Sequence, residues 1–239
     1  AKPPSFPALL GLESPPMAEK IPPRERTRLY LITPPRISDV AEFAAILEGA
    51  LEAGDVASLQ IRLKGDDGKI DMAATRDVTE TVMAMAQAYG TAIIINDSPE
   101  LAVELGADGV HVGPEDMPIK KAREIVGSDM ILGATAKNSR HAAMAAGEQG
   151  ADYVAFGAFY PTETKAGTVP AELELLEFWQ ETMELPCVAI GGITVDNAAP
   201  LVTAGADFLA VSSGVWNHPQ GAAAAVFAFN ALLDSLHSR

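Results

Sequence analysis

Residues 91–116, TAIIINDSPELAVELGADGVHVGPED, contain the unit that decides the fold. Residues 92–95 are apolar and mostly β-branched, which is typical of a strand buried on both faces. Ser98 is placed to cap a short helix, and residues 109–112 form a second apolar run. Polar residues follow each run. The stretch therefore predicts two parallel strands joined by a helix, with polar side chains at the carboxyl end of each strand.

The same alternation runs from residue 28 to the end of the chain. Strands are predicted at residues 29–33, 58–63, 92–95, 109–112, 130–135, 153–156, 187–190 and 208–211. Helical periodicity fills the intervals and continues through the alanine-rich residues 221–236. Eight strands alternating with eight helices predict an α/β protein with a single (β/α)8 TIM barrel. An open doubly wound sheet is less favoured, because no G-x-G-x-x-G fingerprint follows the first strand.

The tripeptide Gly-Ala-Asp recurs before the fourth, sixth and eighth predicted strands. Glycine ends a helix in a left-handed conformation, and small residues allow a tight turn into the strand. We therefore assign Asp108, Asp152 and Asp207 to stability at the amino-terminal face of the barrel, despite their charge.

Composition indicates one large domain with small-molecule partners. The chain has 239 residues, 48% of them hydrophobic, enough for one barrel. A formal net charge of −15, without a run of basic residues, argues against nucleic acid and anionic membranes as partners. The single cysteine, Cys187, lies in an apolar run, which predicts a buried thiol and a cytoplasmic location. The oligomeric state stays open, a homo-oligomer included.

Residues 1–27 differ in composition from the rest. Seven prolines exclude helix interior and sheet centre, so we expect a flexible proline-rich arm, followed by the barrel domain at residues 28–239. Residues 8–10 are too short an apolar run for a signal peptide. Met17 offers a second possible start.

Two aspartates follow adjacent strands, at the rim where barrels of this kind place their active sites. Asp97 ends the third strand and Asp116 lies just beyond the fourth, so both carboxylates can face one point. Oxygen ligands are those that Mg²⁺ prefers. Each aspartate alone would as readily cap the following helix. The pair beside Asn96 favours a metal site.

Phosphate-binding groups are predicted at the ends of four further strands. Period-two alternation places Gln60, Arg62 and Lys64 on one side of the second strand, where a guanidinium and an ammonium suit phosphate oxygens. The long loop at residues 159–167 adds two hydroxyls and an ammonium, and long loops at this rim usually serve ligands. Small residues after the seventh and eighth strands expose backbone N–H groups and indicate a second phosphate site.

Taken in order, these motifs resemble those of thiamine phosphate synthase. They are residues 60–64 (QIRLK), 95–97 (IND), 109–113 (GVHVG), 161–165 (PTETK) and 189–193 (AIGGI), together with Asp116. The resemblance implies a (β/α)8 enzyme that joins hydroxymethylpyrimidine diphosphate to a thiazole phosphate and releases pyrophosphate, with Mg²⁺ as cofactor. It also implies the site: Arg62, Lys64, Asn96 and Lys165 on the diphosphate, Asp97 and Asp116 on Mg²⁺, Gln60 on the pyrimidine, and Thr162, Thr164, Gly192 and Ser212 on the thiazole phosphate. Arg62, Lys64 and Lys165 would stabilise the leaving group.

The chain departs from the family pattern in places. Pro114 stands where the family usually has glutamine, and Thr135 and Lys137 stand where it has serine and histidine. The first strand also lacks the acid common at its end. Thr135 keeps a hydroxyl for phosphate or thiazole binding. Lys137 disfavours the related thiazole tautomerase, whose chemistry relies on that histidine, but the tautomerase and a non-catalytic binder of a phosphorylated thiamine precursor remain as alternatives. His111, near the rim, is either packed and hydrogen-bonded or in contact with the ligand.

Overall fold

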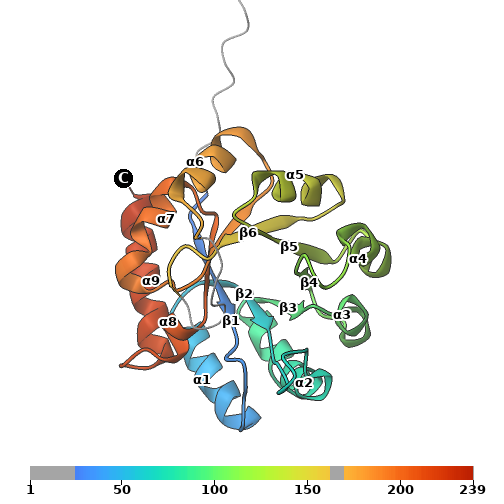
Figure 1. Cartoon of the computed structure of the whole chain (residues 1–239). Coiled ribbons are helices and arrows are strands. Elements are labelled where there is room, and N and C mark those ends of the chain that lie inside the picture. The colour runs from blue at the N-terminus through green and yellow to red at the C-terminus, as the bar shows by residue number, and fades with distance from the viewer. Residues whose placement is uncertain (1–24, 162–169, 239) are drawn as a thin grey trace, which may run out of the picture.

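The structure, a computed structural model, describes residues 25–161 and 170–238. Eight parallel strands close into a barrel in chain order, and the helices surround it (Figure 1). The strands are β1 Arg28–Ile32, β2 Val56–Ile61, β3 Ala92–Asn96, β4 Gly109–Val112, β5 Ile131–Lys137, β6 Tyr153–Gly157, β7 Cys187–Ile190 and β8 Phe208–Val211. The helices are α1 Val40–Glu52, α2 Met72–Ala88, α3 Pro99–Leu105, α4 Ile119–Val126, α5 Arg140–Glu148, α6 Leu173–Thr182, α7 Ala199–Ala204, α8 Ser213–Trp216 and α9 Ala222–His237, with a 3-10 turn η1 at Val195–Asn197.

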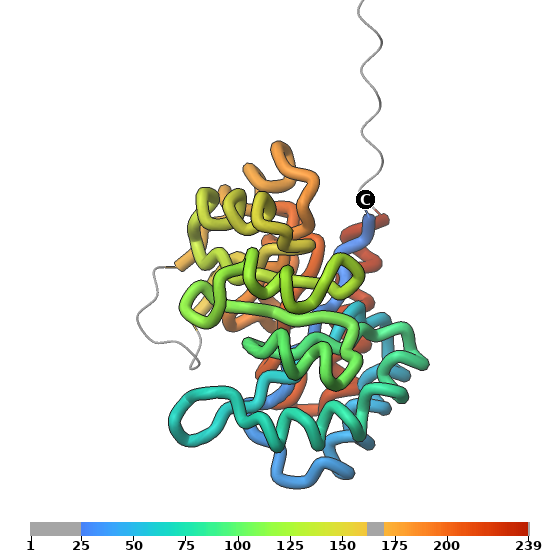
Figure 2. The backbone as a smooth tube through the Cα atoms, turned by 90° about the vertical axis from the view of Figure 1, so that its right-hand side faces the viewer, coloured from blue at the N-terminus to red at the C-terminus, as the bar shows by residue number. Residues whose placement is uncertain are grey.

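The predicted (β/α)8 barrel is confirmed. Strands β4, β7 and β8 have the predicted bounds, and the other five differ by one or two residues at an end. The helix α8 after β8 is an addition that the prediction of eight helices did not include. Figure 2 shows α2, α3, α4 and α5 following one another along one side of the molecule.

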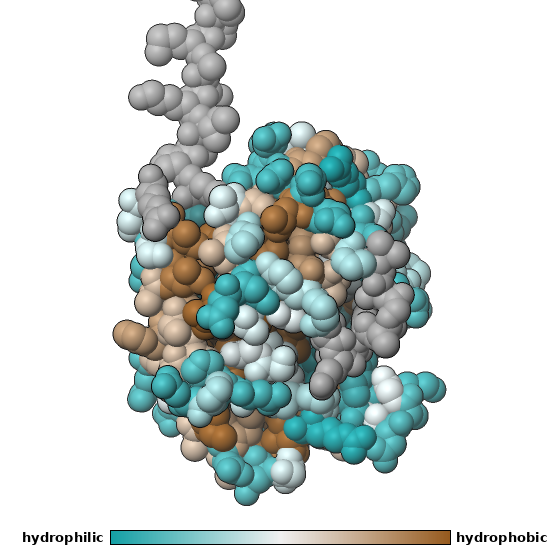
Figure 3. All heavy atoms as spheres, turned by 60° about the vertical axis from the view of Figure 1, so that its left-hand side comes forward, coloured by the Kyte–Doolittle hydropathy of each residue, from teal (hydrophilic) through white to brown (hydrophobic). Residues whose placement is uncertain are grey.

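Alternate residues of each strand face the barrel interior. On β2, Leu59 and Ile61 belong to the core between strands and helices. A separate apolar cluster fills the interior, made of Tyr30, Ile32, Tyr153, Ala155, Val188 and Ala210. The helices turn their apolar sides toward the strands. The face drawn in Figure 3 nevertheless shows hydrophobic residues among the hydrophilic ones.

Short polar side chains fix where the helices begin. Asp39, Asp71, Ser98 and Ser139 each accept a hydrogen bond from a backbone N–H in the first turn of α1, α2, α3 and α5. Such caps satisfy donors that a helix leaves without internal partners. The predicted cap at Ser98 is confirmed, and the cap of α1 is Asp39.

The Gly-Ala-Asp repeats close the amino-terminal face, as predicted. Each aspartate carboxylate accepts the backbone N–H at or near the start of the strand before its own: Asp108 from Ile93 at 2.7 Å, Asp152 from Leu132 at 2.7 Å and Asp207 from Cys187 at 2.8 Å. The repeat glycines have positive φ, the conformation in which a helix ends before a tight turn. These three carboxylates therefore help to fix the register between neighbouring strands.

Contacts with the barrel domain begin two residues before its predicted boundary at residue 28. Thr27 is buried and donates from Oγ1 to the carbonyl of Ala206 at 2.8 Å. Arg26 contacts the side chains of Asp234 and Asn230 on α9. The sequence places both residues in the arm, but short polar contacts hold them against the barrel. Residues 1–24 of the predicted arm, with Met17, lie outside the described residues. Within residues 25–161 and 170–238, no helix has the length and apolarity needed to cross a membrane.

Candidate active site

Charged side chains from β2 and β3 meet at the carboxyl rim. Nζ of Lys64 lies 2.5 Å from Oδ2 of Asp97, and both side chains are mostly shielded from solvent. Asp97 has a left-handed backbone with φ of 64°, and its N–H donates to the carbonyl of His111 on β4 at 2.8 Å. The turn after β3 therefore holds this carboxylate in one place at the mouth of the barrel.

The second acid is close enough to interact with the first. Partial burial raises the pKa of Asp116, and a side-chain hydrogen bond and charge repulsion from Asp97 raise it further. The N–H of Gly113, which donates to Asp116 Oδ2 at 2.9 Å, and the charge of Lys64 oppose this rise in pKa. The structure therefore brings together the two predicted metal ligands and one predicted phosphate ligand.

The alternative that these aspartates cap the following helices is wrong. The cap of α3 is Ser98, whose hydroxyl accepts from Leu101. Helix α4 begins after Pro118 without a side-chain cap, and Asp116 instead bonds within its own turn. Neither carboxylate is occupied by a helix end, so both remain directed to the rim.

Two amides and a guanidinium beside the acids have no partner among the described residues. The side chains of Gln60 and Asn96 are only 4% and 5% exposed, and no described group hydrogen-bonds to either amide. The one fully enclosed side-chain oxygen or nitrogen without a partner in the described chain is Oγ1 of Thr75, so the amide atoms of Gln60 and Asn96 are not fully enclosed. The guanidinium of Arg62 is likewise unpaired in the described part. The backbone N–H of Arg62 donates to Thr33 Oγ1 at 2.9 Å. Donors and acceptors that fold inward without a protein partner are suited to a ligand.

A hydrogen-bonded row below the rim forms the floor of the site. The hydroxyls of Tyr30 and Tyr153 lie 2.8 Å apart, Tyr153 OH lies 3.0 Å from Nδ1 of His111, and Nε2 of His111 lies 2.8 Å from Thr135 Oγ1. Burial raises the pKa of both tyrosines, so the phenols are neutral. His111 is therefore packed and hydrogen-bonded through both ring nitrogens, and Thr135 meets His111 in this row.

Sequence reasoning missed the two tyrosines of this row. A signal was present: Tyr153 is an inward position of β6, and Gly133 occupies the neighbouring inward position on β5. A Cβ on Gly133 would lie 2.0 Å from Cζ of Tyr153, so glycine is what makes room for the ring. The ring of His111 stacks on that of Tyr153 with centroids 5.5 Å apart.

The loops after β6 and β7 are bound to each other at the opposite side of the rim. Tyr160 donates from its hydroxyl to the carbonyl of Asn197 at 2.6 Å, and Asn197 donates from Nδ2 to the carbonyl of Gly192 at 3.0 Å. Gly192 has φ of 62°, and a Cβ there would meet the carbonyl oxygen of Pro161 at 2.4 Å. This close approach requires glycine.

Ser212 lies at the same side, immediately before α8, and donates to the carbonyl of Thr33 at 3.2 Å. The first N–H groups of α8 are those a helix leaves without internal partners. Gly192 and Ser212 thus lie where the second phosphate site was predicted. Thr162, Thr164 and Lys165 lie outside the described residues.

The donor set at Asp97 and Asp116 suits Mg²⁺ better than it suits a metal ion whose ligands all come from protein side chains. Within the described ranges no group of three or more His, Cys, Asp or Glu side chains is placed to hold a metal ion. Mg²⁺ commonly uses one or two carboxylates and takes its other ligands from water and phosphate. A divalent cation would also offset the repulsion that raises the pKa of Asp116.

The fold and this rim define a (β/α)8 barrel with a polar, charge-rich ligand site at the carboxyl ends of its strands. More particularly, the chain belongs to the family described as thiamine monophosphate synthase, which residues 29–215 match. A thiamine-phosphate synthase of Hyphomonas neptunium is 70% identical over 220 residues, which cover 92% of this chain and 100% of that protein. One from Rhodospirillum centenum is 58% identical over 206 residues, covering 86% and 97%. The solved thiamine phosphate pyrophosphorylase of Pyrococcus furiosus superposes with a TM-score of 0.73 at 30% identity, covering 87% and 96%.

Proposed function

We propose that this protein is a Mg²⁺-dependent thiamine-phosphate synthase, a transferase that joins hydroxymethylpyrimidine diphosphate to a thiazole phosphate. The observation that carries the proposal is the cluster of Lys64, Asp97 and Asp116 beside Arg62 and Asn96, whose side chains have no partner among the described residues. Family membership and relatives named for this activity, up to 70% identical, support it.

The cationic groups of β2 serve the leaving group. When the bond between the pyrimidine methylene and oxygen breaks, negative charge grows on the diphosphate and positive charge on the methylene. Arg62 presents a fork of donors, and Lys64 a point charge, to the diphosphate oxygens. In a site shielded from water, such fixed charges stabilise the transition state without reorganisation.

Asp97 and Asp116 would hold the metal ion. Mg²⁺, when bound, would neutralise charge on the diphosphate. The protein's own part is to keep the two carboxylates together, which the left-handed turn at Asp97 and the Gly113–Asp116 hydrogen bond do. Lys64, now paired with Asp97, lies close enough to contact a diphosphate bound beside the acids.

The remaining groups orient the two substrates. Gln60 offers an amide donor and acceptor to the pyrimidine, and the floor made by Tyr30, Tyr153 and His111 limits how deeply the ring enters. Gly192 and Ser212 are placed to hold the thiazole phosphate. The thiazole nitrogen is itself the nucleophile, so orientation rather than a general base provides the rate advantage.

The test is pyrophosphate release from purified protein with Mg²⁺ and both substrates, with thiamine phosphate measured in parallel. We expect equimolar products, and a loss of kcat/KM of at least about a hundredfold in Asp97→Asn and in Arg62→Gln. The matched control is Arg76→Gln, because Arg76 pairs with Glu104 between α2 and α3, on the outer ring of helices (Figure 1). Binding of both substrates without pyrophosphate release would reject the proposal and favour the non-catalytic binder.

A further inference from the structure

We propose that Lys137 is a further diphosphate-binding residue, which pairs with Glu115 until the diphosphate binds. The inference deepens the proposed function and rests on it. Lys137 was singled out from the sequence only because the family usually has histidine there. Its backbone, its side-chain partner and its place on the rim each point to a role in binding an anion.

The backbone of Lys137 is unusual in the same way as that of Asp97. Among the described residues, these two are the only non-glycine residues with positive φ, 54° for Lys137 and 64° for Asp97. A left-handed conformation is unfavourable for a residue with a Cβ, and such outliers gather at functional sites. The ladder between β5 and β6 also shifts register between Thr135 and Lys137, an irregularity that redirects side chains at a strand end.

The side-chain contact of Lys137 does not by itself account for this conformation. Nζ lies 3.4 Å from Oε1 of Glu115, with the lysine side chain 42% exposed and the glutamate 87% exposed. Ion pairs as exposed as this one contribute little to stability. A weak surface contact would not maintain a strained backbone, whereas a ligand that needs an ammonium at this point would give the conformation a function.

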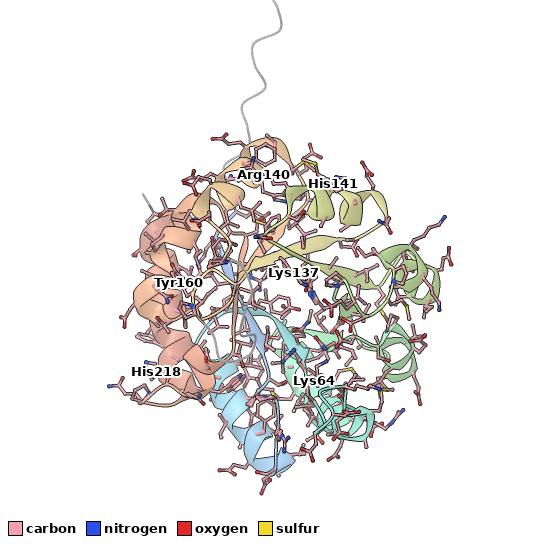
Figure 4. The ribbon with its side chains drawn as sticks, viewed as in Figure 1. Lys64, Lys137, Arg140, His141, Tyr160 and His218 are labelled. Atoms are coloured by element: carbon pink, nitrogen blue, oxygen red, sulfur yellow. The ribbon has the colours of Figure 1, made fainter. Side chains whose placement is uncertain are left out.

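The position of Lys137 identifies the ligand. Lys64, Asp97 and Asp116 follow β2, β3 and β4, and Lys137 is the last residue of the neighbouring strand β5, so one lysine flanks the acid pair on each side. In Figure 4, Lys137 lies over the middle of the barrel and Lys64 lies beside α2, whereas Arg140 and His141 lie farther out beside α5. An anion bound through a metal on the two acids is thereby within the field of both lysines.

This ligand is the diphosphate rather than the thiazole phosphate. Glu115, the partner of Lys137, is adjacent in sequence to Asp116, so the ion pair ties Lys137 to the loop of the acid pair. Gly192 and Ser212 instead follow β7 and β8, with β6 between them and Lys137. Glu115 competes with the diphosphate for the ammonium and keeps it beside the site when no ligand is bound.

The proposal makes opposite predictions for the two partners of one ion pair. Inorganic pyrophosphate is titrated calorimetrically into the intact protein in excess Mg²⁺. Lys137→Met should weaken its binding about tenfold, because a charge-assisted contact is lost. Glu115→Gln should tighten its binding roughly threefold, because the competing carboxylate is removed. The control, Lys121→Met on the exposed side of α4, should leave the affinity unchanged.

A purely structural ion pair gives a different pattern, because either substitution breaks it equally. Equal effects of Lys137→Met and Glu115→Gln, or no effect of Lys137→Met, would overturn the proposal. So would weaker binding of the thiazole phosphate, titrated in a second series, with unchanged binding of pyrophosphate. Failure of the proposed function is seen separately, as absence of turnover in the unsubstituted protein, while the pyrophosphate affinities report on Lys137 alone.

Discussion

Gly133→Ala should be among the most damaging single-methyl additions in this barrel. The added Cβ would lie 2.0 Å from Cζ and 2.2 Å from the hydroxyl oxygen of Tyr153. Ordinary contacts of this kind begin near 3.4 Å, so the ring or the strand must move by more than 1 Å. The movement would break the hydrogen bonds of Tyr153 with Tyr30 at 2.8 Å and with His111 at 3.0 Å.

The expected loss of unfolding free energy is about 3–5 kcal/mol. Overpacking of a rigid core contributes about 1–3 kcal/mol, and each of the two buried hydrogen bonds about 1 kcal/mol. Urea unfolding followed by circular dichroism measures it. The control is Gly49→Ala in α1, where a Cβ meets nothing within 4 Å. Replacing this helix glycine should stabilise the protein by up to about 1 kcal/mol.

A second background tests the cause. In Tyr153→Leu the ring is absent, so the further cost of Gly133→Ala should fall below about 1 kcal/mol, which gives a large coupling energy between the two sites. The reasoning is refuted if Gly133→Ala lies within about 0.5 kcal/mol of the unsubstituted protein, or if its cost is the same in both backgrounds.

Three further predictions concern single polar groups. Asp116→Asn should abolish synthase turnover yet raise the unfolding free energy without metal by a few tenths of a kcal/mol, because it removes repulsion from Asp97. The pKa of Asp116 is raised in the folded state, so its contribution to stability is present at low pH and is lost as the pH rises through that pKa; urea unfolding across pH should show a smaller decline in the Asn variant. Thr75→Val should raise the unfolding free energy by about 1 kcal/mol, because Oγ1 of this buried residue has no hydrogen-bond partner in the part of the chain that the structure describes. Asp207→Asn should lower the thermal midpoint while kcat is retained, because its carboxylate bonds to Cys187 N at the face opposite the site.

The fold was predictable because its determinants are local. Short apolar runs, caps such as Ser98 and the repeated Gly-Ala-Asp turns act within a few residues, and eight repetitions leave few topologies other than a barrel. Strand ends were less accurate: β2 begins and ends two residues earlier than predicted, because Arg62 and Lys64 continue the alternation beyond the last ladder pair. Helix α8 is only four residues long and shows no periodicity to predict it.

The site's clustering of Lys64, Asp97 and Asp116 was predictable, because charge and strand position coincide there, while their roles as ligands stay predictions. Its floor was not, because Tyr30, Tyr153 and His111 come from three strands distant in the chain and meet only when the barrel closes. The positive φ angles of Asp97 and Lys137 were also not predictable, because neither residue type indicates a left-handed backbone as glycine does.

The aspartates at the two ends of the barrel show how one residue type divides between stability and function. Asp108, Asp152 and Asp207 each accept a strand N–H, so their charge is satisfied by the backbone they organise. At the other end, Asp97 and Asp116 face each other, and the pKa of Asp116 is raised partly because of that repulsion. A fold that maximised stability alone would separate or neutralise this pair. Their proximity is a cost that a cation can offset, and the flanking lysines are then free to hold an anion, which is the chemistry that release of pyrophosphate requires.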